Sequence, residues 1–225
     1  MTIKVLYEDN HLLIVDKPVN IPVQADASED EDLLTLLKAY IKEKYNKPGD
    51  VFLGLVHRLD RPVGGAIVFA RTSKAASRLS NEVRLQKLER EYHAVVEGEF
   101  QQRKGTLTNH LFKNQAKNIS KVVHKNHKNS KMAKLDYEVV GKQDNLSLVK
   151  VKLHTGRSHQ IRVQLAHAGH PLIGDQKYNE NAEAGRQIAL YSTYLKVKHP
   201  TKDEFVEVTC QPPSSYPWSE FNVFN

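Results

Sequence analysis

The chain has 225 residues, 40% of them hydrophobic, which suffices for one domain with a core of its own. A single cysteine, Cys210, excludes an internal disulfide and a cysteine-based zinc site, and the eleven histidines show no metal-binding spacing, so no metal and no cofactor are expected. The net charge of +7 favours an anionic partner, while the missing signal-peptide core and membrane-length apolar stretch predict a cytoplasmic protein without membrane contact.

Hydrophobic periodicity predicts ten strands and three helices. The strand patterns cover residues 5–7, 12–16, 52–56, 66–70, 92–97, 106–111, 134–140, 146–153, 188–197 and 204–209. The helical patterns cover 32–45, 73–86 and 158–168, with Ser73 as the N-cap of the second. Many strands and few helices in no regular alternation predict an α+β fold, a mostly antiparallel mixed sheet with a few flanking helices. We expect a single domain over 1–225.

The third predicted helix carries two kinds of side chain. His159, Arg162 and Ala166 share one face at three- and four-residue spacing, and Ile161, Leu165 and Ala168 share another. Such a helix can bury its apolar face and direct Arg162 toward a site. A surface charge on an exposed helix is the alternative for this arginine.

All of the excess positive charge lies between residues 100 and 135. This segment holds nine Lys and Arg and no Asp or Glu, which leaves 24 basic against 26 acidic residues for the rest of the chain. Its Lys121, Lys125, Lys128 and Lys131, with several His and Asn, suit contacts to phosphate and sugar. A solvated, mobile lysine-rich loop is the alternative interpretation.

A carboxylate stands between two arginines in the run 57–65, His-Arg-Leu-Asp-Arg-Pro-Val-Gly-Gly. The run joins two apolar stretches, and its Pro and Gly residues allow a tight turn. The neighbouring cations favour an ionised Asp60, which makes it a candidate nucleophile at a bend between strands. A surface salt bridge is the more common outcome for such a cluster.

Two further segments extend this motif. Residues 89–98 read Glu-Arg-Glu-Tyr-His-Ala-Val-Val-Glu-Gly, and residues 153–162 read Leu-His-Thr-Gly-Arg-Ser-His-Gln-Ile-Arg, followed by Gly-His-Pro-Leu-Ile-Gly-Asp at 169–175. Together with the opening blocks at 5–9 and 13–18, the chain resembles the RluA-type pseudouridine synthases from about residue 3 to residue 208. It departs from the family pattern at Val63-Gly64 (usually Thr-Ser), at Gln164 (usually His) and at Arg90 (usually Lys).

The resemblance implies a role for each matching residue. Asp60 would be the nucleophile, Tyr92 would stack on the target base, and Arg162 would pair with Asp60. Arg58 would fill the space left by the flipped nucleotide, while His57 is expected to be structural. Without the resemblance, Tyr92 would be read as a core residue. Further RNA contacts are expected from Arg61 and Arg157 beside the four lysines.

The implied function is isomerisation of specific uridines to pseudouridine in structured RNA, either ribosomal or transfer RNA, by a catalytic domain of the pseudouridine synthase type. The RNA-contacting segment would be residues 100–135, and we expect a monomer without an S4-type RNA-binding domain. Two alternatives belong to other classes. One is a non-catalytic RNA-binding protein that retains the fold. The other is a hydrolase that cleaves a nucleoside bond with paired carboxylates, for which no second acid is evident in the sequence.

Overall fold

The computed structural model describes residues 3–222 and 224 and divides the chain into two compact units. Unit 1 comprises Met1–Glu89 and Ser192–Cys210, and unit 2 comprises Arg90–Tyr191 and Gln211–Asn225. Across the described residues the expected α+β class with mostly antiparallel strands is confirmed. The single catalytic domain stays a prediction. No helix among these residues is both long enough and apolar enough to cross a membrane.

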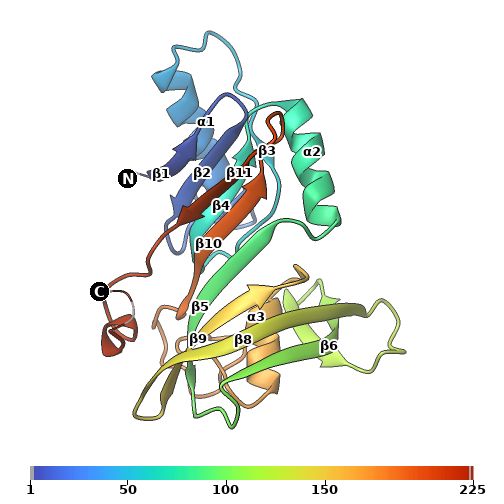
Figure 1. The fold of residues 1–225 in the computed structure, drawn as a ribbon, viewed down its shortest axis with the longest axis vertical. Helices are drawn as coiled ribbons and strands as arrows, with labels where there is room; N and C mark the ends of the chain where they lie inside the picture. Colours follow the sequence, from blue (N-terminus) through green and yellow to red (C-terminus); the bar gives the residue numbers. More distant parts are fainter. Residues whose placement is uncertain (1–2, 223, 225) are drawn as a thin grey trace. The chain divides into compact units, whose positions relative to one another are not determined.

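In unit 1 the strands follow the order β1-β2-β4-β10-β11, and β3 also pairs with β4. Their bounds are β1 Lys4–Glu8, β2 Leu12–Lys17, β3 Gly54–Leu55, β4 Gly64–Ala70, β10 Leu190–Lys198 and β11 Phe205–Thr209. Side chains of β2 and β4 are almost wholly buried, as expected for central strands covered on both faces. Helices α1 (Leu33–Lys44) and α2 (Ser73–Arg84) flank this sheet (Figure 1).

The two helices of unit 1 begin at side-chain caps. The Asp32 carboxylate accepts the backbone N–H of Thr35 at 3.1 Å, and the hydroxyl of Thr72 accepts that of Ala75 at 3.1 Å. The predicted cap at Ser73 was therefore wrong by one residue: Ser73 is already helical, and Thr72 has the extended backbone of a cap. The sequence offers a hydroxyl at both positions, so the spacing alone did not decide between them.

Unit 2 contains a sheet with the order β5-β9-β8-β6-β7, antiparallel at every pair. The bounds are β5 Glu89–Glu97, β6 Lys104–Asn114, β7 Ile119–Val123, β8 Lys131–Gln143 and β9 Leu146–Leu153, with a short 3-10 helix at Trp218–Glu220. Residues 100–135 thus contain β6, β7 and the start of β8, so the segment is not one continuous loop, although Lys125 and Lys128 lie in the connection at 124–130. Strand β7 was not predicted, because five residues interrupted by a lysine give little periodic signal.

Helix α3 (Gln160–His167) packs against β6 and β7 and is buried on all sides over its first six residues. The prediction of one polar and one apolar face was therefore wrong. Its polar side chains find partners for most of their groups: Gln160 Oε1 accepts the Thr155 hydroxyl at 2.8 Å, and the Gln164 amide N–H donates to Asn109 Oδ1 at 2.8 Å, while Gln164 Oε1 accepts no hydrogen bond from a described residue. Gln164, which departs from the family pattern, thereby ties α3 to β6.

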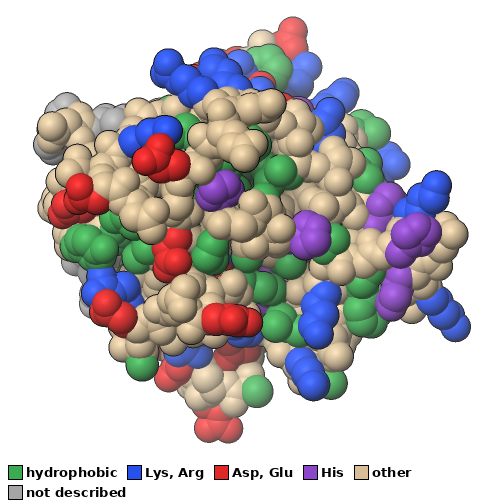
Figure 2. Space-filling model, turned by 90° about the horizontal axis from the view of Figure 1, so that it is seen from below, with side chains coloured by type: hydrophobic (Ala, Val, Ile, Leu, Met, Phe, Trp, Pro, Cys, Tyr) green, Lys and Arg blue, Asp and Glu red, His purple; other side chains and the backbone are tan. Residues whose placement is uncertain are grey.

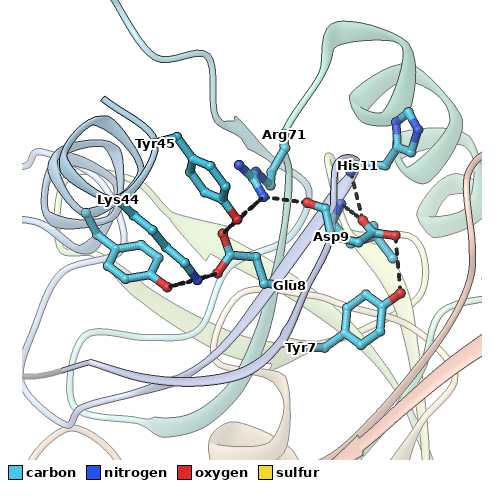
Figure 3. Close-up of polar contacts among 9 residues, drawn as sticks. Tyr7, Glu8, Asp9, His11, Lys44, Tyr45 and Arg71 are labelled. Carbon is cyan, nitrogen blue, oxygen red and sulfur yellow. Dashed lines mark hydrogen bonds and ion pairs between the residues drawn. The ribbon is translucent and has the colours of Figure 1, made fainter. Parts of the chain in front are cut away.

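Two carboxylates at the end of β1 join separate parts of unit 1 (Figure 3). Glu8 accepts hydrogen bonds from Lys44 Nζ at 2.7 Å, the Tyr45 hydroxyl at 2.8 Å and Arg71 Nη1 at 3.0 Å. Asp9 accepts the backbone N–H groups of residues 11 and 12, both at 2.8 Å, and pairs with His199 Nε2 at 2.7 Å. The pair of acids therefore connects β1 to α1, to the residue after β4 and to the end of β10.

Asp9 makes the stability of unit 1 sensitive to acid. Burial alone would raise the pKa of this carboxyl, but the backbone N–H groups of His11 and Leu12, with His199, lower it to about 2. As the pH falls, the unfolded chain binds a proton at this residue before the folded chain does. The stabilisation from Asp9 is therefore complete above pH 3.8 and is lost between pH 3.8 and 2.

We predict that Asp9→Asn lowers the free energy of unfolding at pH 7 by on the order of 1 kcal/mol, because an uncharged amide accepts these hydrogen bonds less strongly. The difference from wild type should shrink as the pH approaches 2, where Asp9 is itself protonated. Urea unfolding from pH 7 to pH 2.5 measures this, with the exposed Asp50→Asn as control. A deficit of equal size at both ends of the pH range would contradict the assignment.

Candidate active site

Asp60 lies at a tight turn that leads into β4. The backbone N–H of Val63 donates to the carbonyl oxygen of Asp60 at 2.9 Å, closing the turn. Gly65 follows with a φ of +111°, and a Cβ there would lie 2.2 Å from the carbonyl oxygen of Ser192. Only glycine allows the chain to come this close to β10. Gly65 therefore determines where the chain enters the sheet after the turn at Asp60.

Lys17, which the sequence did not mark as a site residue, holds this turn from inside unit 1. Its side chain is fully buried, and Nζ donates to the carbonyl oxygens of Pro18 at 2.9 Å, Ile21 at 2.7 Å and Arg61 at 3.0 Å. Burial lowers the pKa of Lys17 to about 7, and the charge of Asp60 opposes that shift. Three carbonyl acceptors satisfy three ammonium hydrogens, so Lys17 links the end of β2 to the residue next to Asp60.

The other polar residues of this run have different surroundings. His57 is buried, and its Nε2 accepts the backbone N–H of Val68 at 3.2 Å, an arrangement that suits the expected structural role. Arg58 is exposed to solvent. Arg61 forms an ion pair with Asp30 and donates to Ser28 Oγ at 2.9 Å, which fixes the segment between β2 and α1. RNA contact by Arg58 and Arg61 stays a prediction.

Tyr92 lies in β5 of unit 2, opposite Val151 of β9, and is 4% exposed. Side chains alternate along a strand, so Tyr92 shares a face of β5 with Arg90 and Ala94, which are also buried. This burial is compatible with a core residue and with an aromatic platform inside a pocket. The stacking role of Tyr92 stays a prediction.

Arg162 is held by a carboxylate of its own unit. Its Nε and Nη2 donate to the two oxygens of Asp175 at 2.8 and 2.6 Å, and the two side chains are 4% and 0% exposed. The Tyr178 ring lies 5.2 Å from the guanidinium carbon. A fork of this kind fixes both the position and the plane of the guanidinium. The predicted Asp60–Arg162 pair stays a prediction, since Asp60 belongs to unit 1.

The segment that leads into α3 is attached to the basic strands. The hydroxyl of Tyr178 accepts the backbone N–H of Ser120 at 2.7 Å and pairs with His159 Nδ1 at 2.8 Å. Arg157 Nε donates to the carbonyl oxygen of Met132 at 2.9 Å, so Arg157 is partly engaged in holding β8. Its predicted contact with RNA stays a prediction.

Strands β6 to β8 and their connections carry exposed cations. Figure 2 shows Lys, Arg and His side chains gathered at the right-hand edge, with little acidic surface among them. Within the described part of the chain the following lysines are exposed and have no carboxylate partner: Lys121, Lys125, Lys128 and Lys131. No three His, Cys, Asp or Glu of residues 3–222 and 224 converge as metal ligands.

We predict that Asp175→Asn destabilises unit 2 by about 3–5 kcal/mol, because it removes the carboxylate that accepts two hydrogen bonds from the buried guanidinium of Arg162. Urea unfolding measures the change. Asp144→Asn, at an exposed turn of the same unit, should stay within about 0.5 kcal/mol of wild type. Equal stability of the two variants would show that the Arg162–Asp175 pair is not a buried ion pair in solution.

Comparison with known proteins identifies the family. Residues 11–167 match the family model described as RNA pseudouridylate synthase. Over 205 residues the chain is 34% identical to an uncharacterized RNA pseudouridine synthase of Bacillus subtilis, YhcT, covering 90% of this chain and 66% of that protein. It is also 31% identical over 222 residues to ribosomal large subunit pseudouridine synthase D of Haemophilus influenzae, covering 91% of this chain and 66% of that protein. The chain thus spans slightly less than two thirds of these relatives.

Solved structures share the fold. Human RNA pseudouridylate synthase domain containing 1 superimposes with a TM-score of 0.76 at 25% identity, covering 96% of this chain and 86% of that one. Human RNA pseudouridylate synthase domain containing 4 gives a TM-score of 0.79 at 20% identity, covering 93% and 88% of the two chains, a likeness of fold alone. With the family model matched over more than half of its length, the chain belongs to the RNA pseudouridylate synthase family, and its relatives are of the RluA type.

Proposed function

We propose that this protein converts specific uridines of structured RNA to pseudouridine, with Asp60 as the nucleophile. The observation that carries the proposal is that the family match over residues 11–167 includes Asp60, Tyr92 and Arg162. Two relatives are named ribosomal large subunit pseudouridine synthases, which favours ribosomal over transfer RNA as the substrate.

The proposed reaction is an isomerisation, so every atom of the uridine stays in the RNA. The bond from the ribose C1′ to uracil N1 breaks, the uracil turns while the pocket retains it, and C5 bonds to C1′. The hydrogen on C5 is then lost as a proton while N1 gains one. The Asp60 carboxylate supports this sequence by bonding transiently to the sugar or to the base.

The other site residues have proposed roles around that step. Target bases of a folded RNA are stacked, so the uridine must leave its stack before Asp60 can reach it. Arg58, exposed beside Asp60 in the sequence, would occupy the vacated space, and Tyr92 would stack on the uracil. Arg162, fixed in plane by Asp175, would pair with Asp60 and orient its carboxylate.

We predict that Asp60→Asn folds and binds RNA as wild type does but forms pseudouridine at least about 10³-fold more slowly, because an amide cannot act as the nucleophile. Pseudouridines are first mapped in RNA from cells with and without this gene, and the site that is lost identifies the substrate. The purified variant is then assayed on that RNA. Asp50→Asn should retain full activity. Near-normal turnover by Asp60→Asn would refute the nucleophile. Release of free uracil by the wild-type protein would indicate a hydrolase instead, and RNA binding without product would indicate a non-catalytic binder.

We predict that replacing Lys121, Lys125, Lys128 and Lys131 with Gln weakens binding to all RNAs similarly. The slope of log affinity against log salt should become shallower by about 0.7–0.9 per lost phosphate contact, because fewer counterions are released. The matched control replaces four exposed lysines of unit 1, Lys42, Lys47, Lys74 and Lys87, and changes the net charge equally. The same slope in both quadruple variants would refute direct contact by strands β6 to β8.

A further inference from the structure

Arg90 is a buried cation without a partner. Its side chain is 9% exposed, and no acceptor among the described residues receives a hydrogen bond from its guanidinium. The Nε–H is fully enclosed and unsatisfied. Arginine stays charged in proteins, and an enclosed charge without a counter-charge is strongly unfavourable. A folded chain that keeps such a group leaves it available to a ligand.

The same unit supplies a counter-charge to its other buried arginine. Arg162 has both oxygens of Asp175, at 2.6 and 2.8 Å. Nothing comparable faces Arg90 within residues 3–222 and 224, where its guanidinium forms neither an ion pair nor a contact with an aromatic ring. Within the described part of unit 2, Gln164 Oε1 is also enclosed without a hydrogen bond, but only at Arg90 does this lack fall on a charged group.

The backbone beside Arg90 is shaped to admit its guanidinium. A Cβ added at Gly156 would lie 3.1 Å from Nη1 and 3.2 Å from Nη2. Glycine at this turn thus lets the flat group lie against the chain, between the end of β9 and the start of α3. Arg90 also shares a face of β5 with Tyr92, two residues and about 7 Å along the strand.

We propose that Arg90 is an anion-binding residue whose ligand is a backbone phosphodiester of the RNA, next to the nucleotide that Tyr92 contacts. This rests on the proposed RNA substrate. A planar guanidinium with free Nη donors matches two phosphate oxygens in a bidentate pair. The exposed lysines on β7 and β8 of the same unit give an incoming polyanion a favourable electrostatic path. The phosphate supplies the counter-charge that the protein itself omits.

The inference makes opposite predictions for stability and for binding. Arg90→Met keeps most of the side-chain length but removes the charge. Its urea midpoint should equal or exceed that of wild type, because an uncompensated buried charge is gone. Its affinity for RNA should fall by roughly ten-fold or more, because a charge-assisted bidentate contact is lost. A structural arginine would show the reverse pattern.

The probe is a 12-nucleotide oligouridylate, measured by fluorescence anisotropy, and a set of the same oligomers with one methylphosphonate each. For wild type, a methylphosphonate at one or two positions of the oligomer should weaken binding as much as Arg90→Met does. For the Arg90→Met variant, a methylphosphonate at those same positions should cause no further loss of affinity. Arg186→Met is the matched control in unit 2, since Arg186 is paired with Glu183, and it should bind as wild type. Gly156→Ala, which crowds the guanidinium, should weaken binding at the same positions.

Unchanged oligouridylate affinity in Arg90→Met would overturn the proposal, as would a lowered urea midpoint without loss of affinity. Failure of the wild-type protein to bind the oligomer would also overturn it. Pseudouridine formation is scored separately in the wild type. Phosphate binding through Arg90 in a protein that makes no pseudouridine would leave this inference standing and refute the proposed function alone.

Discussion

The cost of removing cations from water is the constraint on which the rest of this structure depends. Among the described residues, Lys17 is 0% exposed, Arg162 4% and Arg90 9%, and the three meet this cost in different ways. Lys17 has three backbone carbonyls, Arg162 has a carboxylate, and Arg90 has neither. The contacts of Lys17 and of Arg162 also determine local geometry, because in each case separate segments of the chain bind the same charged group.

Both solutions act on segments that carry candidate catalytic residues. Lys17 joins the end of β2 to the carbonyl of Arg61, so the turn at Asp60 is bound to a central strand of unit 1. Asp175 lies 13 residues beyond Arg162 and fixes its guanidinium on a helix that is itself buried. Catalytic groups held this way need little reorganisation during a reaction, which lowers the barrier for charge development. Positioning is thus achieved separately in each unit.

Local signals explain which features the sequence could predict. The helix Leu33–Lys44 and most strands have clear apolar periodicity, and Asp60, Tyr92 and Arg162 stand in long motifs. The burial of α3 could not be read locally, because the Gln164 amide N–H donates to Asn109, which is 55 residues away. Lys17 and Asp175 also stand in the matching segments, but for the same reason the sequence did not show which groups their side chains would bind. Their partners are set by the fold and not by neighbouring residues.

The unpaired cations fall into two physical classes, and an RNA ligand would need both. Charges on exposed lysines act over about a Debye length and are screened by salt, so they attract a polyanion without placing it. A guanidinium inside the protein acts at contact distance, is poorly screened and has a fixed orientation. The first class sets how readily RNA arrives, and the second sets where one phosphate comes to rest. A buried charge without a partner lowers the stability of the fold. Arg90 carries such a charge, and it lies on the face of β5 that also holds Tyr92. That coincidence is what a binding site, as opposed to a packing fault, would produce.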